Sequence, residues 1–213
     1  MYIIPFILLG QGQTPEDVFK TLPREKIAVC NWPQVQSYVP EATFAMFHDG
    51  DNIYIQYEVD ELNIKADVDT LNGPVYKDSC CECFISPNTG DGLYYNFEVN
   101  CIGKVLYSCR PGRKDAQRST LEQTALVKTK SSLGDKAFPE RKPDGKWTMI
   151  VQIPREAFFN HNIDTFKGKT FKMNVYKCGD DLSTPHYVSW MPIPIERPNF
   201  HAPEYFVEVK LGE

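Results

Sequence analysis

Carboxylate and amide side chains recur at alternate positions in the stretch from Asp78 to Cys101, which reads DSCCECFISPNTGDGLYYNFEVNC. Glu82, Asn96 and Glu98 are the residues in it that could do chemistry. Carboxylates and amides offer paired hydrogen-bonding atoms to a bound ligand, and two carboxylates held close together can also exchange protons. The first question is which structural element would bring these side chains together.

The pattern predicts a β-hairpin in which each strand has one apolar and one polar face, because successive side chains in a strand point to opposite sides. The segment SPNTGDG between the arms has the composition of a hairpin turn. Polar side chains in the middle of a strand are poor strand formers, so this polar row is either a binding face or a solvated sheet face. The apolar set comprises Cys81, Cys83, Ile85, Tyr95, Phe97, Val99 and Cys101, and the polar set Glu82, Tyr94, Asn96, Glu98 and Asn100.

The same alternation recurs along the chain and predicts an all-β protein. Turn-forming segments such as HDGD, KPDG and KGK separate the expected strands, and Thr14-Pro15 begins one short helix. Many short strands with few helices favour an antiparallel β-sandwich, jelly-roll-like, with a few short helices. The further strands are expected at residues 53–59, 147–153, 171–177, 186–191 and 205–211.

A single domain spanning residues 1–213 is expected, because no linker or repeat divides the sequence. Residues 1–24 would form an N-terminal extension, with an opening strand in residues 2–9 followed by the short helix. The polar, less periodic stretch from Arg110 to Lys146 is more typical of a long surface connection than of a second domain.

Charge and hydropathy exclude two classes of partner. The net charge is −5, and no run or stripe of basic residues is present, so a nucleic-acid partner is not expected. The longest apolar stretch, residues 2–9, is too short to span a membrane and lacks the basic start of a signal peptide.

The seven cysteines are expected to be free thiols, because their number is odd and most lie in apolar strand patterns. This favours a reducing, cytoplasmic location; export, with a signal peptide outside the given sequence, is the alternative. Cys80, Cys81 and Cys83 cannot converge on one zinc ion without distortion, because neighbouring strand residues face opposite sides.

The order of motifs resembles a known family. Asn31-Trp32-Pro33 is followed by PEATFAMFHDGDNIYIQYEV, DSCCECFISP, YYNFEVNCIG, WTMIVQIP, GKTFKMNVYKCGD and HYVSWMPIPIERPNFHAPEYFVEVKL. Over residues 25–211 this is similar to family 9 carbohydrate-binding modules and their DOMON-like relatives, in particular a stand-alone branch from Bacteroides-type bacteria. The resemblance implies a β-sandwich that binds the ends of plant polysaccharide chains or small oligosaccharides. Members attached to xylanases clamp a sugar between two aromatic side chains, and many bind structural calcium.

Sugar recognition requires an aromatic plane for the C–H face of the ring and planar polar groups for vicinal hydroxyls. Trp32 is expected to be a core residue, and His201, in the motif NFHAPE, a hydrogen-bonded loop anchor. The expected sugar-binding residues, with Trp190 or a nearby tyrosine as the stacking plane, are Glu82, Tyr94, Asn96, Glu98, Asn174, Tyr176 and Trp190.

Three questions stay open at the level of sequence. The pairs Asp49/Asp51 and Asp67/Asp69 could supply oxygen ligands to calcium, but turn formation explains them equally well, so no cofactor is assigned. Glu82 and Glu98 on paired strands could approach the ~5 Å spacing of a retaining glycosidase pair, although a shallow sheet face would leave them too solvated for acid catalysis. The third reading is a protein-interaction sandwich that binds no sugar.

Overall fold

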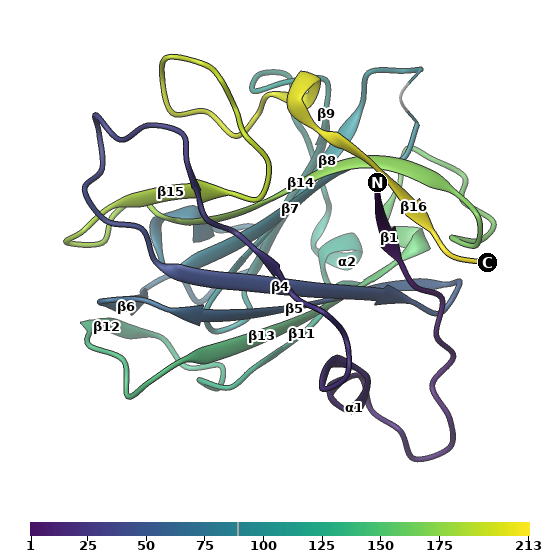
Figure 1. Cartoon of the computed structure of the whole chain (residues 1–213), viewed down its shortest axis with the longest axis horizontal. Helices are drawn as coiled ribbons and strands as arrows, with labels where there is room; N and C mark the ends of the chain where they lie inside the picture. Colours follow the sequence, from purple (N-terminus) through teal and green to yellow (C-terminus); the bar gives the residue numbers. More distant parts are fainter. Residues whose placement is uncertain (89) are drawn as a thin grey trace.

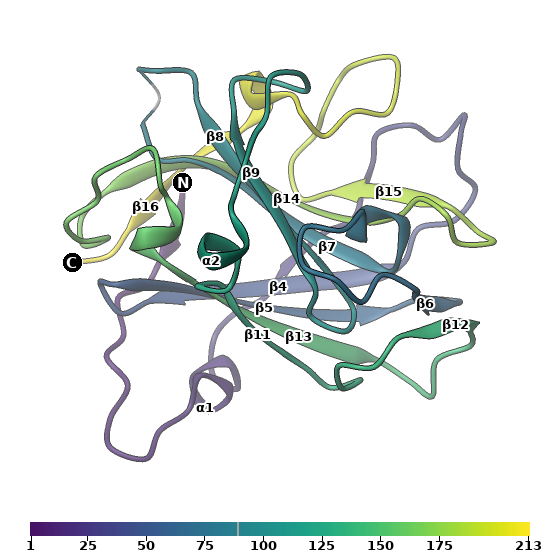
Figure 2. The same ribbon diagram turned by 180° about the vertical axis from the view of Figure 1, so that it is seen from behind.

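The alternating segments form two large β-sheets packed face to face, shown in the computed structural model in Figures 1 and 2, which describes residues 1–88 and 90–213. The main apolar core lies between the two sheets, and smaller apolar clusters cover parts of their outer faces. The predicted antiparallel β-sandwich is confirmed, with one exception: β1 runs parallel to β16. Thr89, in the expected hairpin turn, lies outside the described residues.

The larger sheet has nine strands within the described residues, and it carries the polar row. Its main path is β1-β16-β14-β7-β8-β9-β10, and β15 pairs with both β14 and β3. The strands are β1 (Tyr2–Ile4), β3 (Val29–Cys30), β7 (Cys80–Ser86), β8 (Tyr94–Asn100), β9 (Val105–Arg110), β10 (Gln117–Arg118), β14 (Thr170–Gly179), β15 (His186–Ser189) and β16 (Val207–Leu211).

The second sheet has the order β11-β13-β5-β4-β2, and a two-stranded ribbon pairs β12 with β6. Short helical turns connect the strands; α1 begins after Thr14 with Pro15 in its first position, as the sequence predicts. The bounds are β2 (Glu25–Lys26), β4 (Glu41–His48), β5 (Asn52–Asp60), β6 (Ile64–Ala66), β11 (Lys128–Ser131), β12 (Phe138–Arg141), β13 (Trp147–Pro154), α1 (Pro15–Phe19), α2 (Leu121–Thr124), and the 3-10 turns η1 (Val75–Lys77), η2 (Arg155–Ala157) and η3 (Pro203–Tyr205).

The core lies between the sheets and follows the predicted alternation. The apolar set of the β7–β8 hairpin is buried there against β5 and β13, in one cluster with Tyr57, Trp147 and Met149. The seven cysteines are free thiols, as predicted, and all except Cys30 are buried. Burial of so much apolar surface is the main stabilising contribution to the fold.

Two expectations about the chain's organisation need correction. Residues 110–146 are more than a surface connection, because β11 extends the second sheet beside β13 and β12 pairs with β6. The opening strand covers only Tyr2–Ile4, after which Phe6 makes an isolated bridge to His48. In the described residues, no helix is long and apolar enough to cross a membrane.

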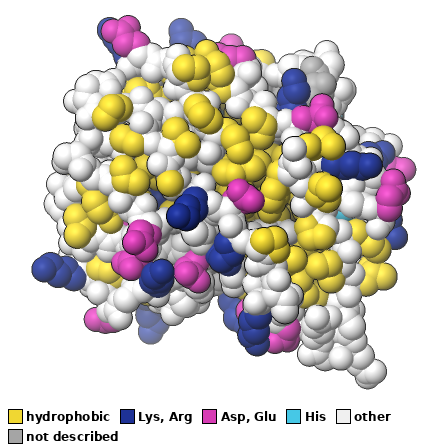
Figure 3. All heavy atoms as spheres, viewed as in Figure 1, with side chains coloured by type: hydrophobic (Ala, Val, Ile, Leu, Met, Phe, Trp, Pro, Cys, Tyr) yellow, Lys and Arg dark blue, Asp and Glu magenta, His cyan; other side chains and the backbone are white. Residues whose placement is uncertain are grey.

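The surface seen in Figure 3 carries hydrophobic side chains across its upper and central part and charged ones mainly toward its lower left and rim. Exposed apolar residues such as Val35 and Val39 belong to the loop between β3 and β4. Exposed apolar surface of this kind is common in folded proteins and does not by itself mark a binding site.

Candidate functional site

A pocket of about 350 Å³ lies on the outer face of the larger sheet. Strands β7, β8, β9 and β14 form its floor, and the segments after β3, β9, β14 and β15 and before β7 form its walls. Its size is at the lower end of the range for small-molecule sites. The lining residues are Trp32, Tyr76, Glu82, Asn96, Glu98, Leu106, Ser108, Arg110, Arg113, Arg118, Cys178, Asp180, Tyr187, Pro198, Asn199, Phe200 and His201.

Two carboxyl groups lie side by side on the floor. Glu82 of β7 and Glu98 of β8 are direct partners across the antiparallel pair, so the prediction that they occupy paired strands is confirmed. The prediction that a sandwich face would leave them solvated is wrong, because their exposed fractions are only 3% and 4%. The walls enclose the floor far more than a bare sheet face would.

Two polar atoms on this floor lack a partner within the described residues. The amide of Asn96 donates to Oε1 of Glu98 over 2.7 Å, but Oδ1 of Asn96 and Oε2 of Glu98 accept no hydrogen bond. A buried acceptor without a donor costs about 1–3 kcal/mol. Two such atoms at the base of one pocket are the arrangement that a hydroxyl-bearing ligand would satisfy.

Burial controls the charge of the floor. It raises the pKa of Glu82 well above the ordinary value, and the neighbouring Glu98 carboxylate raises it further. Burial also raises the pKa of Glu98, against the opposing effects of the Asn96 hydrogen bond and the Arg110 charge. A protonated carboxyl donates as well as accepts, so near neutral pH the pair can do both.

Charged side chains surround the floor. Arg110 comes from the end of β9, whereas Arg113 and Arg118 are exposed and come from the following segment. Asp180 faces them from the end of β14, and burial followed by the charge of Asp181 raises its pKa to about 6. Guanidinium groups bond adjacent oxygen atoms in pairs, so the rim can also recognise hydroxyls.

Aromatic rings complete the walls. Phe200 stacks on Tyr176, with ring centroids 4.3 Å apart and planes inclined by 12°. Trp32 is fully buried behind it and donates from Nε1 to the carbonyl of Ile195 over 2.8 Å. Tyr76 is 37% exposed, and Tyr187 is half-buried. The pocket therefore combines aromatic surface with convergent polar groups.

Comparison with known proteins shows which family has this architecture. The sequence profile of the family described as "Carbohydrate-binding family 9" matches residues 16–211. The chain belongs to carbohydrate-binding family 9. Carbohydrate binding is the function of this family, and no curated protein matches the chain.

Solved structures similar to this family 9 module agree in fold. A Bacteroides uniformis protein named as a candidate carbohydrate-binding protein is 35% identical, with a TM-score of 0.91, covering 99% of this chain and 98% of its own. A family 9 module from Caldicellulosiruptor kristjanssonii in complex with glucose is 13% identical, with a TM-score of 0.62, covering 99% and 95%. The cellotriose complex is also 13% identical, with a TM-score of 0.60, covering 99% and 93%.

Three of the seven residues expected to bind sugar line the pocket of this family 9 module: Glu82, Asn96 and Glu98. Tyr94 and Tyr176 are on the same face, but both are fully buried in an aromatic cluster beneath the loop that follows β15. Asn174 clamps that loop by accepting from the backbone N–H of Met191 and donating to its carbonyl. These three residues shape the pocket rather than line it.

The placement of Trp190 on the polar face was wrong. Trp190 packs in the core between the sheets, where its ring meets Phe44 and Tyr2 edge to face at centroid distances of 5.3 Å. The sequence correctly put Trp190 on the side of Val188, but that side is the inner one. Trp190 is therefore not available as a stacking plane on the outer face.

His201 is the loop anchor that the sequence predicts, and it also lines the pocket. The Tyr94 hydroxyl lies 2.9 Å from its Nδ1, and Nη1 of Arg110 lies 3.1 Å from both ring nitrogens. Burial, with Arg110 nearby, lowers the pKa of His201 to about 3, so the ring is neutral. A neutral ring beside Arg110 fixes the loop without adding charge.

Two of the aspartates considered for calcium have protein partners in the structure. Asp49 accepts hydrogen bonds from Asp51, Asn52 and Tyr54, as a turn residue does, and Asp67 pairs with Lys65. Among the described residues, the one group of three or more cysteine, histidine or acidic side chains close enough to share an ion is Cys80, Glu82 and Cys178. Its thiols do not suit calcium, which prefers oxygen ligands.

Sequence reasoning missed most of the walls. Arg110 had a detectable signal, because Leu106, Ser108 and Arg110 alternate in β9 as Asn96 and Glu98 do in β8. Tyr76 and Phe200 come from irregular segments that carry no periodic pattern, so only the folded loops show that they reach the pocket.

Proposed function

We propose that this pocket binds the terminal sugar of a plant-type oligosaccharide or polysaccharide chain. Family membership supports carbohydrate as the ligand, and the structures with glucose and cellotriose show sugars bound to proteins of the same fold. A volume of about 350 Å³ suits one or two sugar rings better than a long segment of chain.

The unpartnered pair of acceptors carries the proposal. Oδ1 of Asn96 and Oε2 of Glu98 are both buried on the floor, on two side chains that are hydrogen-bonded to each other. Vicinal hydroxyls of a sugar could donate to these two atoms, whereas an apolar ligand would leave both unsatisfied. The half-buried rings of Phe200 and Tyr187 lie on the walls, where they can cover the apolar face of the same sugar.

The experiment begins with a thermal-shift screen of glucose, xylose and short cello- and xylo-oligosaccharides, followed by calorimetric titration of the best ligand. Glu98→Gln keeps an acceptor for Asn96 but removes the carboxylate, and it should weaken binding by roughly 10- to 100-fold, since hydrogen bonds to charged groups contribute about 1.5–3 kcal/mol. Glu208→Gln is the matched control, because Glu208 is an exposed strand carboxylate of the same sheet and is not among the residues that line the pocket.

Unchanged affinity in Glu98→Gln would place the site elsewhere, and a wild-type protein that binds no sugar in the screen would refute the proposal. Release of reducing ends, measured in parallel, tests the glycosidase alternative. That alternative requires two carboxyls on either side of a scissile bond. Glu82 and Glu98 instead lie side by side on one floor, which favours binding over hydrolysis.

A further inference from the structure

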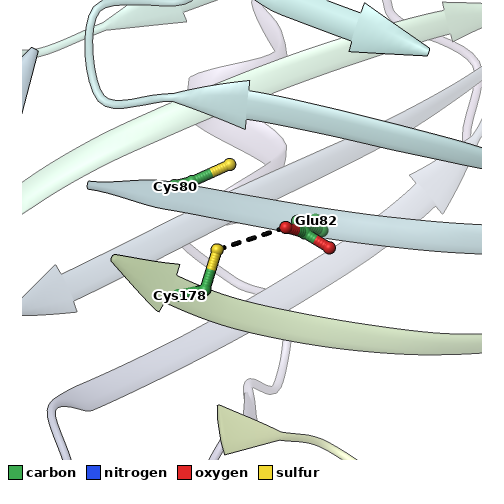
Figure 4. A group of neighbouring side chains, drawn as sticks. All are labelled: Cys80, Glu82 and Cys178. Atoms are coloured by element: carbon green, nitrogen blue, oxygen red, sulfur yellow. Dashed lines mark hydrogen bonds between the residues drawn. The ribbon is translucent and has the colours of Figure 1, made fainter. Parts of the chain in front are cut away.

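Two cysteines from distant parts of the sequence meet beside Glu82. Cys80 and Cys178 are direct partners across β7 and β14, and Glu82 follows Cys80 by two residues on the same face. Figure 4 shows the three side chains on these neighbouring strands, with Sγ of Cys178 directed toward Glu82. Local spacing argued against a zinc ion held by Cys80, Cys81 and Cys83, but the fold supplies a different set.

The three side chains already have the spacing of a metal-ligand set. Sγ of Cys178 lies 3.2 Å from Oε1 of Glu82, and one ligand atom from each residue lies within 4.8 Å of the others. Zn–S bonds of about 2.3 Å and Zn–O bonds of about 2.0–2.2 Å in a tetrahedron place ligand atoms roughly 3.5–4 Å apart. Small rotations of these side chains would therefore reach coordination distances.

The chemistry of the set selects the ion. Two thiolates and a carboxylate favour zinc and similar divalent transition metals over calcium or magnesium. All three residues are buried, yet Glu82 and Cys178 line the pocket, which gives an ion a path of entry. Glu98 is the cross-strand partner of Glu82 on the same floor, and its Oε2, which has no partner among the described residues, is a further oxygen acceptor next to the set.

We propose that Cys80, Cys178 and Glu82 bind one divalent transition-metal ion of the zinc class on the pocket floor, with a fourth coordination position open to the pocket. Binding displaces the two thiol protons to solvent, together with the proton of Glu82 when that carboxyl is protonated. The ion offsets the repulsion between Glu82 and Glu98. This inference does not depend on sugar binding, because its ligands come from the protein alone.

The test uses the full chain, freed of metal with a chelator, reduced, and titrated with Zn²⁺ and Co²⁺ in the absence of sugar. One ion per chain is expected, with the near-ultraviolet absorption of a cobalt–thiolate bond and the visible bands of tetrahedral Co²⁺. Affinity should rise with pH, and titrations in two buffers of different ionisation enthalpy should show the release of at least two protons.

Cys80→Ser, Cys178→Ser and Glu82→Gln should each weaken binding by at least ~100-fold, since loss of a mere supporting group outside the ligand set already costs about 10- to 100-fold. Cys30→Ser is the control, because Cys30 is the one half-exposed cysteine and the most accessible to adventitious metal. Melting temperatures show that each variant is folded.

Four results would overturn the proposal. The first three are wild-type affinity in a folded Cys178→Ser variant, cobalt spectra without thiolate absorption, and a disulfide between Cys80 and Cys178 that persists in reductant. The fourth is loss of binding in Cys30→Ser alone, which would assign the metal to that half-exposed thiol.

Discussion

Two buried polar clusters lie on opposite faces of the larger sheet, and they differ in how completely their atoms are paired. Lys177 points inward, where its Nζ donates to Oε2 of Glu61 over 2.7 Å and to Nε2 of His186 over 2.8 Å. The remaining proton of Lys177 goes to the carbonyl of Cys178, and Trp147 donates to the other oxygen of Glu61. Each of these polar atoms in the inner cluster therefore has a hydrogen-bond partner.

The outer cluster, around Glu82, Asn96 and Glu98, is also buried, but its hydrogen bonding is incomplete. It retains two acceptors without donors and faces a pocket instead of the second sheet. Full pairing is what a polar group needs to be tolerated in a core. The paired inner cluster joins the two sheets, whereas the incompletely paired outer cluster has hydrogen-bonding capacity left for a ligand.

Breaking the buried ion pair between Lys177 and Glu61 should have the largest effect on the stability of the protein. Lys177→Met leaves the Glu61 carboxylate buried without a counter-charge, which should lower the free energy of unfolding by about 3–5 kcal/mol. Burial alone would lower the pKa of Lys177, but the adjacent Glu61 raises it overall, so the ammonium is charged. Urea unfolding of Lys177→Met beside Glu98→Gln measures the contrast, and equal stability of the two variants would contradict it.

A double substitution of Lys177 and Glu61 tests whether the unpaired charge causes the loss of stability. Replacing both Lys177 and Glu61 with apolar residues, as Lys177→Met with Glu61→Leu, removes the uncompensated charge and should recover part of the stability lost by Lys177→Met alone. A double variant less stable than the single one would show that Trp147 and His186 depend on Glu61 more than on the charge balance.

The outer cluster should make the stability of the protein depend on pH. Burial, and next the Glu98 carboxylate, raise the pKa of Glu82 well above 4.5. Because the folded state then holds this proton more tightly than the unfolded chain, its contribution to stability is present below pH 4.5 and is lost as the pH rises above it. Each unit of pKa difference corresponds to about 1.4 kcal/mol.

Glu82→Gln should remove this dependence. In metal-free protein, we expect the stability of the wild type to fall, relative to that of Glu82→Gln, as the pH rises above 4.5, measured by denaturant unfolding at each pH. The exposed-site variant Glu208→Gln should follow the wild type. Parallel curves for the wild type and Glu82→Gln would show that Glu82 ionises normally in the folded state.

The sequence was sufficient for the floor of the pocket and insufficient for its walls. Alternation placed Glu82, Asn96 and Glu98 on one face because that property depends only on strand parity. Parity does not reveal which face is inner, and for this reason the sequence predicts Trp190 as a sugar-binding residue although it lies in the core with Val188. The meeting of Cys80 with Cys178 depends on the pairing of β7 with β14, which no local pattern encodes.

The smallest expected effect concerns the wall. Tyr76 is 37% exposed and lines the pocket, while its backbone carbonyl accepts from the N–H of Asp180 and would be retained in a variant. Tyr76→Ala should weaken sugar binding by less than about tenfold, in line with about 0.5–1.5 kcal/mol for an aromatic contact, and should leave stability nearly unchanged. Tyr76→Phe should bind normally if the ring acts as a stacking surface, and Leu71→Ala, a 38% exposed neighbour in the same loop, is the control.

If Tyr76→Phe binds as poorly as Tyr76→Ala, the hydroxyl rather than the ring contacts the ligand. The open cluster would then extend from the floor to the wall, and recognition would depend on hydrogen bonds more than on stacking.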